Sequence, residues 1–119
     1  MYQGFIKVAA GTPRIRVADV DYNAGSIIDM MNRAAQAGVK LLVLPELCVT
    51  GYTCGDLFLQ DTLLDGARRA LDAIAASTRA LDMLAVVGLP LNVDGNLYNC
   101  AAVLYHGSVL ALIPKANLP

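Results

Sequence analysis

Apolar runs alternate with amphipathic segments along the first ninety residues. Three continuous apolar runs predict buried strands, at residues 4–10 (GFIKVAA), 41–44 (LLVL) and 83–89 (MLAVVGL). Between the first two runs, Asp19 and Asp21 are candidate N-caps of a helix that Gly38 ends. Its apolar side chains recur at helical spacing: Ala24, Ile27, Ile28, Met31, Ala34 and Ala35.

A second amphipathic helix is predicted after Asp56, and two hairpins follow the third strand. The apolar stripe of this helix is Leu63, Ala67, Ala70, Leu71 and Ile74, and its charged residues lie largely off that stripe. Asp94-Gly95 accepts the positive φ of a tight hairpin, so residues 97–105 should return as a strand. His106-Gly107-Ser108 repeats the pattern before residues 109–113. Two crossovers followed by a meander predict an α/β fold with a mixed sheet.

The sequence shows no internal repeat or linker, and it stops shortly after the last predicted strand. Because continuous apolar strands need cover on both faces, we expect residues 1–119 to be part of a domain rather than a whole one.

Composition narrows the class of protein. With 119 residues, Lys+Arg 9, Asp+Glu 10 and a net charge of −1, the chain lacks the clustered basic residues that nucleic-acid binding requires. Although 56% of residues are hydrophobic, no apolar run approaches the roughly 20 residues of a membrane span. The first residues do not form a signal peptide, so a cytoplasmic location is expected. Cys48, Cys54 and Cys100 form no zinc motif and are expected to be reduced thiols.

Two opposite charges follow apolar strands in the same local pattern, Glu46 in LVLPE and Lys115 in LIPK. Catalytic groups of α/β sheets gather beyond the carboxyl ends of strands. A Glu near a Lys could act there as a general base or form half of an ion pair. Each could equally be a surface residue behind a Pro that ends its strand.

Three stretches carry a resemblance to a known family: GFIKVAAGTPRIRVADVDYNAGSI, GVKLLVLPELCVTGYTCGDLF and VVGLPLNVDGNLYNCAAVLYHGSVLALIPKANLP. Together they resemble the start of the nitrilase-like (carbon-nitrogen hydrolase) superfamily. LPEL and TGY are shared by many amidases of that superfamily, whereas TCGDLF is similar to the glutaminase domain of glutamine-dependent NAD+ synthetases. The resemblance implies a partial α-β-β-α sandwich, a mixed sheet with helices on one face, incomplete at the C-terminus.

The resemblance also implies roles for particular residues. Glu46 matches the family's general base, Lys115 matches the lysine that stabilises the tetrahedral intermediate, and Tyr52 of TGY is a candidate substrate-binding residue. The nucleophilic Cys of the family lies downstream of the lysine. Neither Cys48 nor Cys54 matches its position, so we expect the 119-residue chain to be inactive alone.

His106 and Cys100 are not assigned to the site. His106 lies in a turn and is expected to be a surface residue, and Cys100 lies in an apolar strand and is expected in the core.

The implied function is that of an enzyme: hydrolysis of glutamine to glutamate and ammonia, which amidates deamido-NAD in a separate synthetase domain. ATP and magnesium would belong to that absent domain, and no cofactor or metal is expected in this chain. Glutamine, the synthetase domain and further copies of the chain, in a homo-oligomer, are the expected partners. The alternatives are a stand-alone amidase acting on another small amide, and a non-catalytic assembly module.

Overall fold

The computed structural model describes residues 6–46, 48–51 and 61–115, with the side chains of Asp61 and Lys115 outside the description. It contains one five-stranded sheet with the strand order β1-β2-β3-β4-β5. The strands are β1 (Val8–Ala10), β2 (Leu41–Val43), β3 (Leu84–Val93), β4 (Asn96–Tyr105) and β5 (Ser108–Lys115). Helix α1 (Val20–Gln36) connects β1 to β2, and α2 (Asp61–Ser77) lies between β2 and β3.

The sheet is mixed, as the sequence predicts. β1, β2 and β3 pair in parallel, with Ala9 opposite Leu42 and Leu42 opposite Ala85. β3, β4 and β5 pair antiparallel as two consecutive hairpins. Parallel neighbours require crossover connections, whereas antiparallel neighbours can be joined by tight turns. The prediction of two crossovers followed by a meander is confirmed.

Helix α1 begins where its capping residue predicts. The Asp19 side chain accepts a hydrogen bond from the backbone N–H of Tyr22 at 3.1 Å, so Asp19 is the N-cap and Asp21 lies in the first turn. Gly38 follows the helix with φ +83°, the left-handed conformation common after a helix end. Ile27 and Met31 are completely buried, as their spacing on the stripe predicts.

Both hairpins turn at the predicted residues. Asp94 and Gly95 have φ of 52° and 81°, and His106 and Gly107 have φ of 48° and 86°. Two successive positive φ angles match the twist of the flanking antiparallel strands. The Gly107 N–H also donates to Thr78 Oγ1 at 2.8 Å, which ties the second turn to the end of α2.

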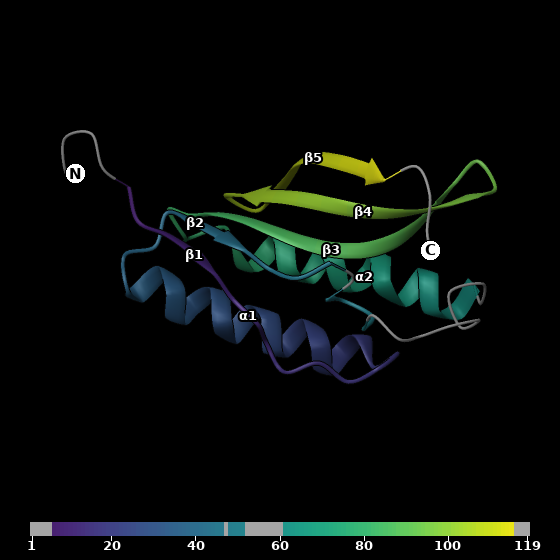
Figure 1. The fold of residues 1–119 in the computed structure, drawn as a ribbon, viewed down its shortest axis with the longest axis horizontal. Helices are drawn as coiled ribbons and strands as arrows, with labels where there is room; N and C mark the ends of the chain where they lie inside the picture. Colours follow the sequence, from purple (N-terminus) through teal and green to yellow (C-terminus); the bar gives the residue numbers. More distant parts are fainter. Residues whose placement is uncertain (1–5, 47, 52–60, 116–119) are drawn as a thin grey trace.

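Both helices lie on one face of the sheet (Figure 1). The hydrophobic core joins residues of these helices and of the strands. Its fully buried side chains come from both helices and from β2, β3 and β4: Ile27, Met31, Leu42, Ile74, Val87, Leu89 and Leu104. On the opposite face, large apolar side chains remain exposed, including Val8, Val43 and Ile113. The predicted α/β class, a mixed sheet with helices on one face, is confirmed.

Three strands differ from the sequence prediction by more than one residue, and one of them, β5, covers Ser108–Lys115 rather than 109–113. β1 covers Val8–Ala10 rather than 4–10, because β2 offers three residues for pairing, and residues 1–5 lie outside the description. β3 continues past Leu89, through Pro90 to Val93. The carbonyls of Val86 and Gly88 bond to residues on the side away from β4. Because the backbone groups of every second residue of a strand point to the same side, the position where Pro90 lacks an N–H also faces away from β4. Pro90 therefore removes no hydrogen bond between β3 and β4.

Candidate functional site

Glu46 lies in a turn whose two ends are hydrogen-bonded to β3. We call residues 44–46 and 48–51 the Glu46 turn. The Leu44 N–H donates to Val86 O at 2.9 Å, and the Val49 N–H donates to Gly88 O at 3.0 Å. Because alternate carbonyls of one strand hold both ends, the chain must project away from β3 between them, and Glu46 is in the projecting part.

The side chain of Asn23 on α1 anchors the far end of this turn. Asn23 is completely buried, and its Nδ2 donates to Val49 O at 2.9 Å and to Arg16 O at 2.8 Å. Its Oδ1 accepts from the Arg16 N–H at 2.7 Å. The amide therefore joins the loop before α1 to the Glu46 turn.

Gly51 closes the Glu46 turn against the same loop. It has φ +92°, and a Cβ there would lie 3.1 Å from Val17 Cα. Both the backbone conformation and the close approach require glycine at this position. The adjacent Thr50 carbonyl accepts a hydrogen bond from the Ala18 N–H at 2.7 Å.

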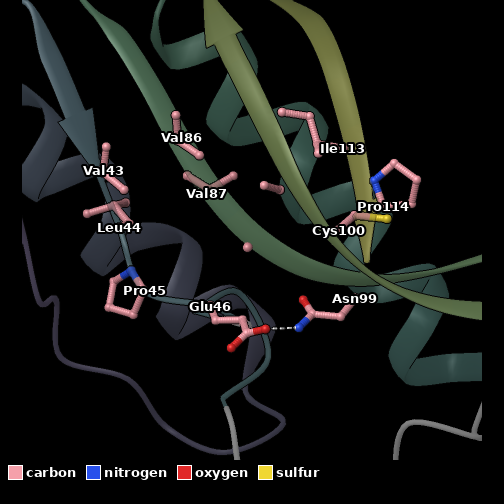
Figure 2. A pocket seen from close by; sticks show the side chains of 12 residues that line it. Val43, Leu44, Pro45, Glu46, Val86, Val87, Asn99, Cys100, Ile113 and Pro114 are labelled. Atoms are coloured by element: carbon pink, nitrogen blue, oxygen red, sulfur yellow. Dashed lines mark hydrogen bonds between the residues drawn. The ribbon is translucent and has the colours of Figure 1, made fainter. Parts of the chain in front are cut away.

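The Glu46 carboxylate meets the side chain of Asn99 from β4. Asn99 Nδ2 donates a hydrogen bond to Glu46 Oε1, and Figure 2 shows the two side chains pointing toward each other. Asn99 is 4% exposed, whereas Glu46 is an exposed residue. A buried, well-packed amide thus contacts an accessible carboxylate. Asn99 was not among the predicted site residues, although an Asn inside the apolar run LYNCAAVLY needs a hydrogen-bond partner when buried.

Lys115 occupies the last position of β5, directly opposite Asn99 in the antiparallel register. Directly opposed residues of such a pair are close neighbours, with Cβ atoms about 4.5–5.5 Å apart. The backbone of residue 115 is thus placed beside the residue that contacts Glu46. The Lys115 side chain and the whole of Tyr52 lie outside the described residues, so their predicted roles stay predictions.

An open pocket of about 460 Å³ lies beside these residues. Its wall is formed by the end of β2 and by parts of β3, β4 and β5, and most of its lining is apolar, with Val43, Val86 and Ile113 among the residues (Figure 2). Within the described lining, Glu46 supplies the charged group and Asn99 the amide. An apolar pocket with a few polar groups, at the carboxyl end of a parallel strand, is a typical place to bind a small molecule.

The two described cysteines are structural. Cys48 is buried, accepts a hydrogen bond from the Gly88 N–H at 3.5 Å, and has a pKa raised by burial to about 11. Cys100 is buried in the core, and burial raises its pKa as well. Since the thiolate is the nucleophilic form, a raised pKa makes a thiol inert at neutral pH. Both are free thiols, as expected, and Cys100 lies in the core as predicted, while Cys54 lies outside the described residues.

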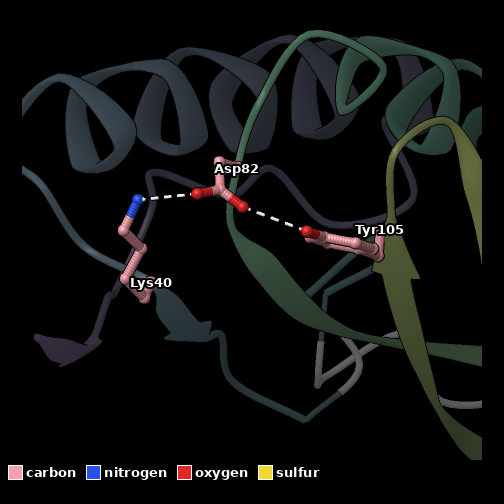
Figure 3. A network of polar contacts seen from close by, with 3 residues as sticks. All are labelled: Lys40, Asp82 and Tyr105. Atoms are coloured by element: carbon pink, nitrogen blue, oxygen red, sulfur yellow. Dashed lines mark hydrogen bonds and ion pairs between the residues drawn. The ribbon is translucent and has the colours of Figure 1, made fainter. Parts of the chain in front are cut away.

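A second polar cluster lies before the start of β2 and β3 and at the end of β4, at the opposite end of β2 from Glu46. Figure 3 shows its three side chains, Lys40, Asp82 and Tyr105. Lys40 Nζ contacts Asp82 Oδ2 at 2.9 Å, and the Tyr105 hydroxyl donates to Asp82 Oδ1 at 3.0 Å. The hydrogen bond from Lys40 lowers the pKa of Asp82, and the hydrogen bond to Asp82 raises the pKa of Tyr105. His106 is an exposed turn residue beside Tyr105, as predicted.

The described part of the chain contains neither a candidate metal site nor a candidate membrane-spanning helix. There, no group of three or more His, Cys, Asp or Glu side chains converges on a point where a metal ion could bind. Neither of the described helices has the length and apolar character to cross a bilayer.

The fold and the carboxylate beside an apolar pocket agree with a family match over most of the chain. Residues 7–116 match the carbon-nitrogen hydrolase family. The chain belongs to that family, and the resemblance noted in its sequence is confirmed.

Within the family, the chain is similar to the beginning of one kind of enzyme. It is 42% identical over 117 residues to the glutamine-dependent NAD(+) synthetase of Mycobacterium tuberculosis strain H37Rv, a match that covers 98% of this chain and 17% of the synthetase. The glutamine-dependent NAD(+) synthetase of Cytophaga hutchinsonii has a TM-score of 0.88 and 35% identity, covering 96% of this chain and 19% of that one. The chain thus spans about a fifth of the length of these synthetases.

A solved amidase shares the same fold. The amidase of Nesterenkonia sp. matches with a TM-score of 0.75 and 28% identity, covering 96% of this chain and 44% of the amidase. The nitrilase-like arrangement of sheet and helices therefore occurs in relatives with and without NAD(+) synthetase in their names.

Proposed function

We propose that this chain forms part of a glutaminase that hydrolyses glutamine to glutamate and ammonia, with the ammonia used to amidate deamido-NAD. The proposal is supported most by the contact between Glu46 and Asn99 at the pocket, with residue 115 opposite Asn99 in register. It is further supported by the similarity to NAD(+) synthetases, which extends over nearly the whole chain.

In the proposed reaction, Glu46 is the general base. It takes the proton from the thiol of a cysteine outside residues 1–119, and the resulting thiolate attacks the amide carbon of glutamine. Glu46 then returns the proton to the leaving ammonia as the thioester forms. In the second half it takes a proton from water, which attacks the thioester carbon, and it gives that proton back to the departing thiolate.

Lys115 would stabilise the negative charge that forms on the amide oxygen. A cation aimed at the developing oxyanion in a partly apolar pocket lowers the barrier because it acts mainly on the transition state. Tyr52 is proposed to contact the substrate. The cysteine required here agrees with one structure of the Nesterenkonia amidase, in which acrylamide has added at the active-site cysteine.

The proposal is tested with a chimera in which residues 7–116 replace the matching segment of the Mycobacterium tuberculosis synthetase. We expect the chimera to release ammonia and glutamate from glutamine, and the 119-residue chain alone to release none. Glu46→Gln and Lys115→Met should each abolish release by the chimera while leaving its folding unchanged. Normal glutaminase activity in the Glu46→Gln chimera would refute the role of Glu46.

The two alternatives to this proposal are a stand-alone amidase and a non-catalytic assembly module. The identities of 42% and 35% to synthetases, against 28% to the amidase, favour the synthetase over a stand-alone amidase. A non-catalytic assembly module would give a folded chimera that stays inactive. Three expectations remain predictions. They are the use of ATP and magnesium by a synthetase domain, a cytoplasmic location, and assembly into a homo-oligomer.

A further inference from the structure

A buried amide on the middle of a strand is directed at the proposed catalytic carboxylate. Asn99 is 4% exposed and lies between Tyr98 and Cys100, which both pack with the core on the helix side of the sheet. Since side chains alternate along a strand, Asn99 points to the opposite face, where the pocket and Glu46 lie. Burying an amide at this point requires a partner, and Glu46 Oε1 is the acceptor.

The direction of this hydrogen bond follows from chemistry. An ionised carboxylate only accepts hydrogen bonds, so Asn99 must present its NH₂ group to Glu46. The bond fixes one carboxylate oxygen, and the other points away from Asn99 (Figure 2). The amide orients the carboxylate through this hydrogen bond.

From this geometry we infer that Asn99 is a positioning residue of the site, which holds Glu46 in the orientation from which it transfers protons. The inference rests on the proposed function of Glu46. The backbone bonds at Leu44 and Val49 fix the ends of the Glu46 turn, whereas the hydrogen bond from Asn99 acts on the Glu46 side chain itself. It does so from a strand whose position is set by pairing on both sides.

The contact itself is tested in the 119-residue chain by NMR, without any activity. We expect the side-chain amide signals of Asn99 to move during an acid titration as Glu46 becomes protonated, and this movement to disappear in Glu46→Gln. The amide of Asn92, an exposed residue of β3, is the internal reference and should not follow the same transition. Identical Asn99 amide signals in the wild type and Glu46→Gln at every pH would overturn the inference.

The role in positioning is tested in the chimera by separating kcat from KM. We expect Asn99→Leu to lower kcat by about 10–100-fold with little change in KM, as misplacing a catalytic group by about 1 Å does. Asn99→Asp, which keeps the shape but loses the donor, should lower kcat similarly, whereas the matched control Asn92→Leu should leave kcat unchanged.

The possible failures are distinct. An inactive wild-type chimera would count against the proposed function, while the NMR titration would still decide whether Asn99 holds Glu46. An active chimera in which Asn99→Leu and Asn99→Asp keep the wild-type kcat would overturn the positioning role alone. A rise in KM with an unchanged kcat would also overturn it, because this result would make Asn99 a substrate-binding residue instead.

Discussion

Replacing Asn23 should weaken the whole protein through the Glu46 turn. Asn23 is fully buried, and its side chain makes three hydrogen bonds, two to Arg16 and one to Val49, at 2.7–2.9 Å. All three partners are backbone groups, so they stay in place when the side chain is removed. In Asn23→Ala, these N–H and C=O groups lose their partner while remaining wholly or partly buried.

The expected loss follows from those three bonds. A protein hydrogen bond contributes a net stabilisation of about 0.5–1.5 kcal/mol, so three give about 3 kcal/mol. Ala gains about 0.5 kcal/mol over Asn in helix propensity, which offsets part of this loss. We therefore expect the free energy of unfolding to fall by about 2–3 kcal/mol, a large effect for a domain with a typical total of about 5–15 kcal/mol.

The measurement is urea unfolding followed by circular dichroism, with Asn32→Ala as the matched control. Asn32 lies on the same helix but is exposed, so it receives the same gain in propensity without losing a buried bond. With slopes of about 1–3 kcal/mol per molar urea, Asn23→Ala should lower the midpoint by roughly 1–3 M relative to the control. A difference below about 0.5 kcal/mol, the usual range for surface substitutions, would refute the argument.

Three further changes test other parts of the structure. Gly51→Ala should destabilise the protein by about 1–3 kcal/mol in thermal unfolding, because φ is +92° and the added Cβ would clash, whereas Gly25→Ala on open helix surface should stabilise it slightly; equal effects of the two would contradict this. Cys48, with its pKa near 11, should react with iodoacetamide at pH 8 far more slowly in the folded chain than in urea, as peptide mass spectrometry can measure. Because Lys40 lowers the pKa of Asp82 in the folded state, the stability that Asp82 contributes is present above about pH 4 and is lost as the pH falls through the lowered pKa. Asp82→Asn should thus be less stable than the wild type at pH 7 but equal to it in acid, and an unchanged difference at both pH values would exclude this linkage.

Features set by neighbours in sequence were predictable. The cap at Asp19, the buried stripe of α1 and the hairpin turns at Asp94-Gly95 and His106-Gly107 depend on a few adjacent residues, and all appear where expected. The tip of β2 before Glu46 could be located in the same way, since a Pro and a charge directly follow an apolar run, whereas β5 continues past its predicted end at residue 113, through Pro114 to Lys115.

Features set by pairing between distant segments could not be read from the sequence. The continuation of β3 through Pro90 depends on which edge of the strand remains unpaired there, and that follows from the short β2. The contact between Glu46 and Asn99 joins residues 53 apart in the chain. A lone Asn in an apolar strand signals that some partner exists, but the sheet register is needed to identify it.

The arrangement of the sheet separates stability from chemistry. The helix-covered face holds the core residues, such as Val87, Leu89 and Leu104, whose truncation would create cavities. Asn99 and residue 115 belong to positions that alternate with these, so they lie at register positions of the other face. Changes at Glu46 and Asn99 therefore act on the face opposite the core, and the urea midpoint of each variant decides whether a loss of activity comes from the geometry of the carboxylate or from unfolding.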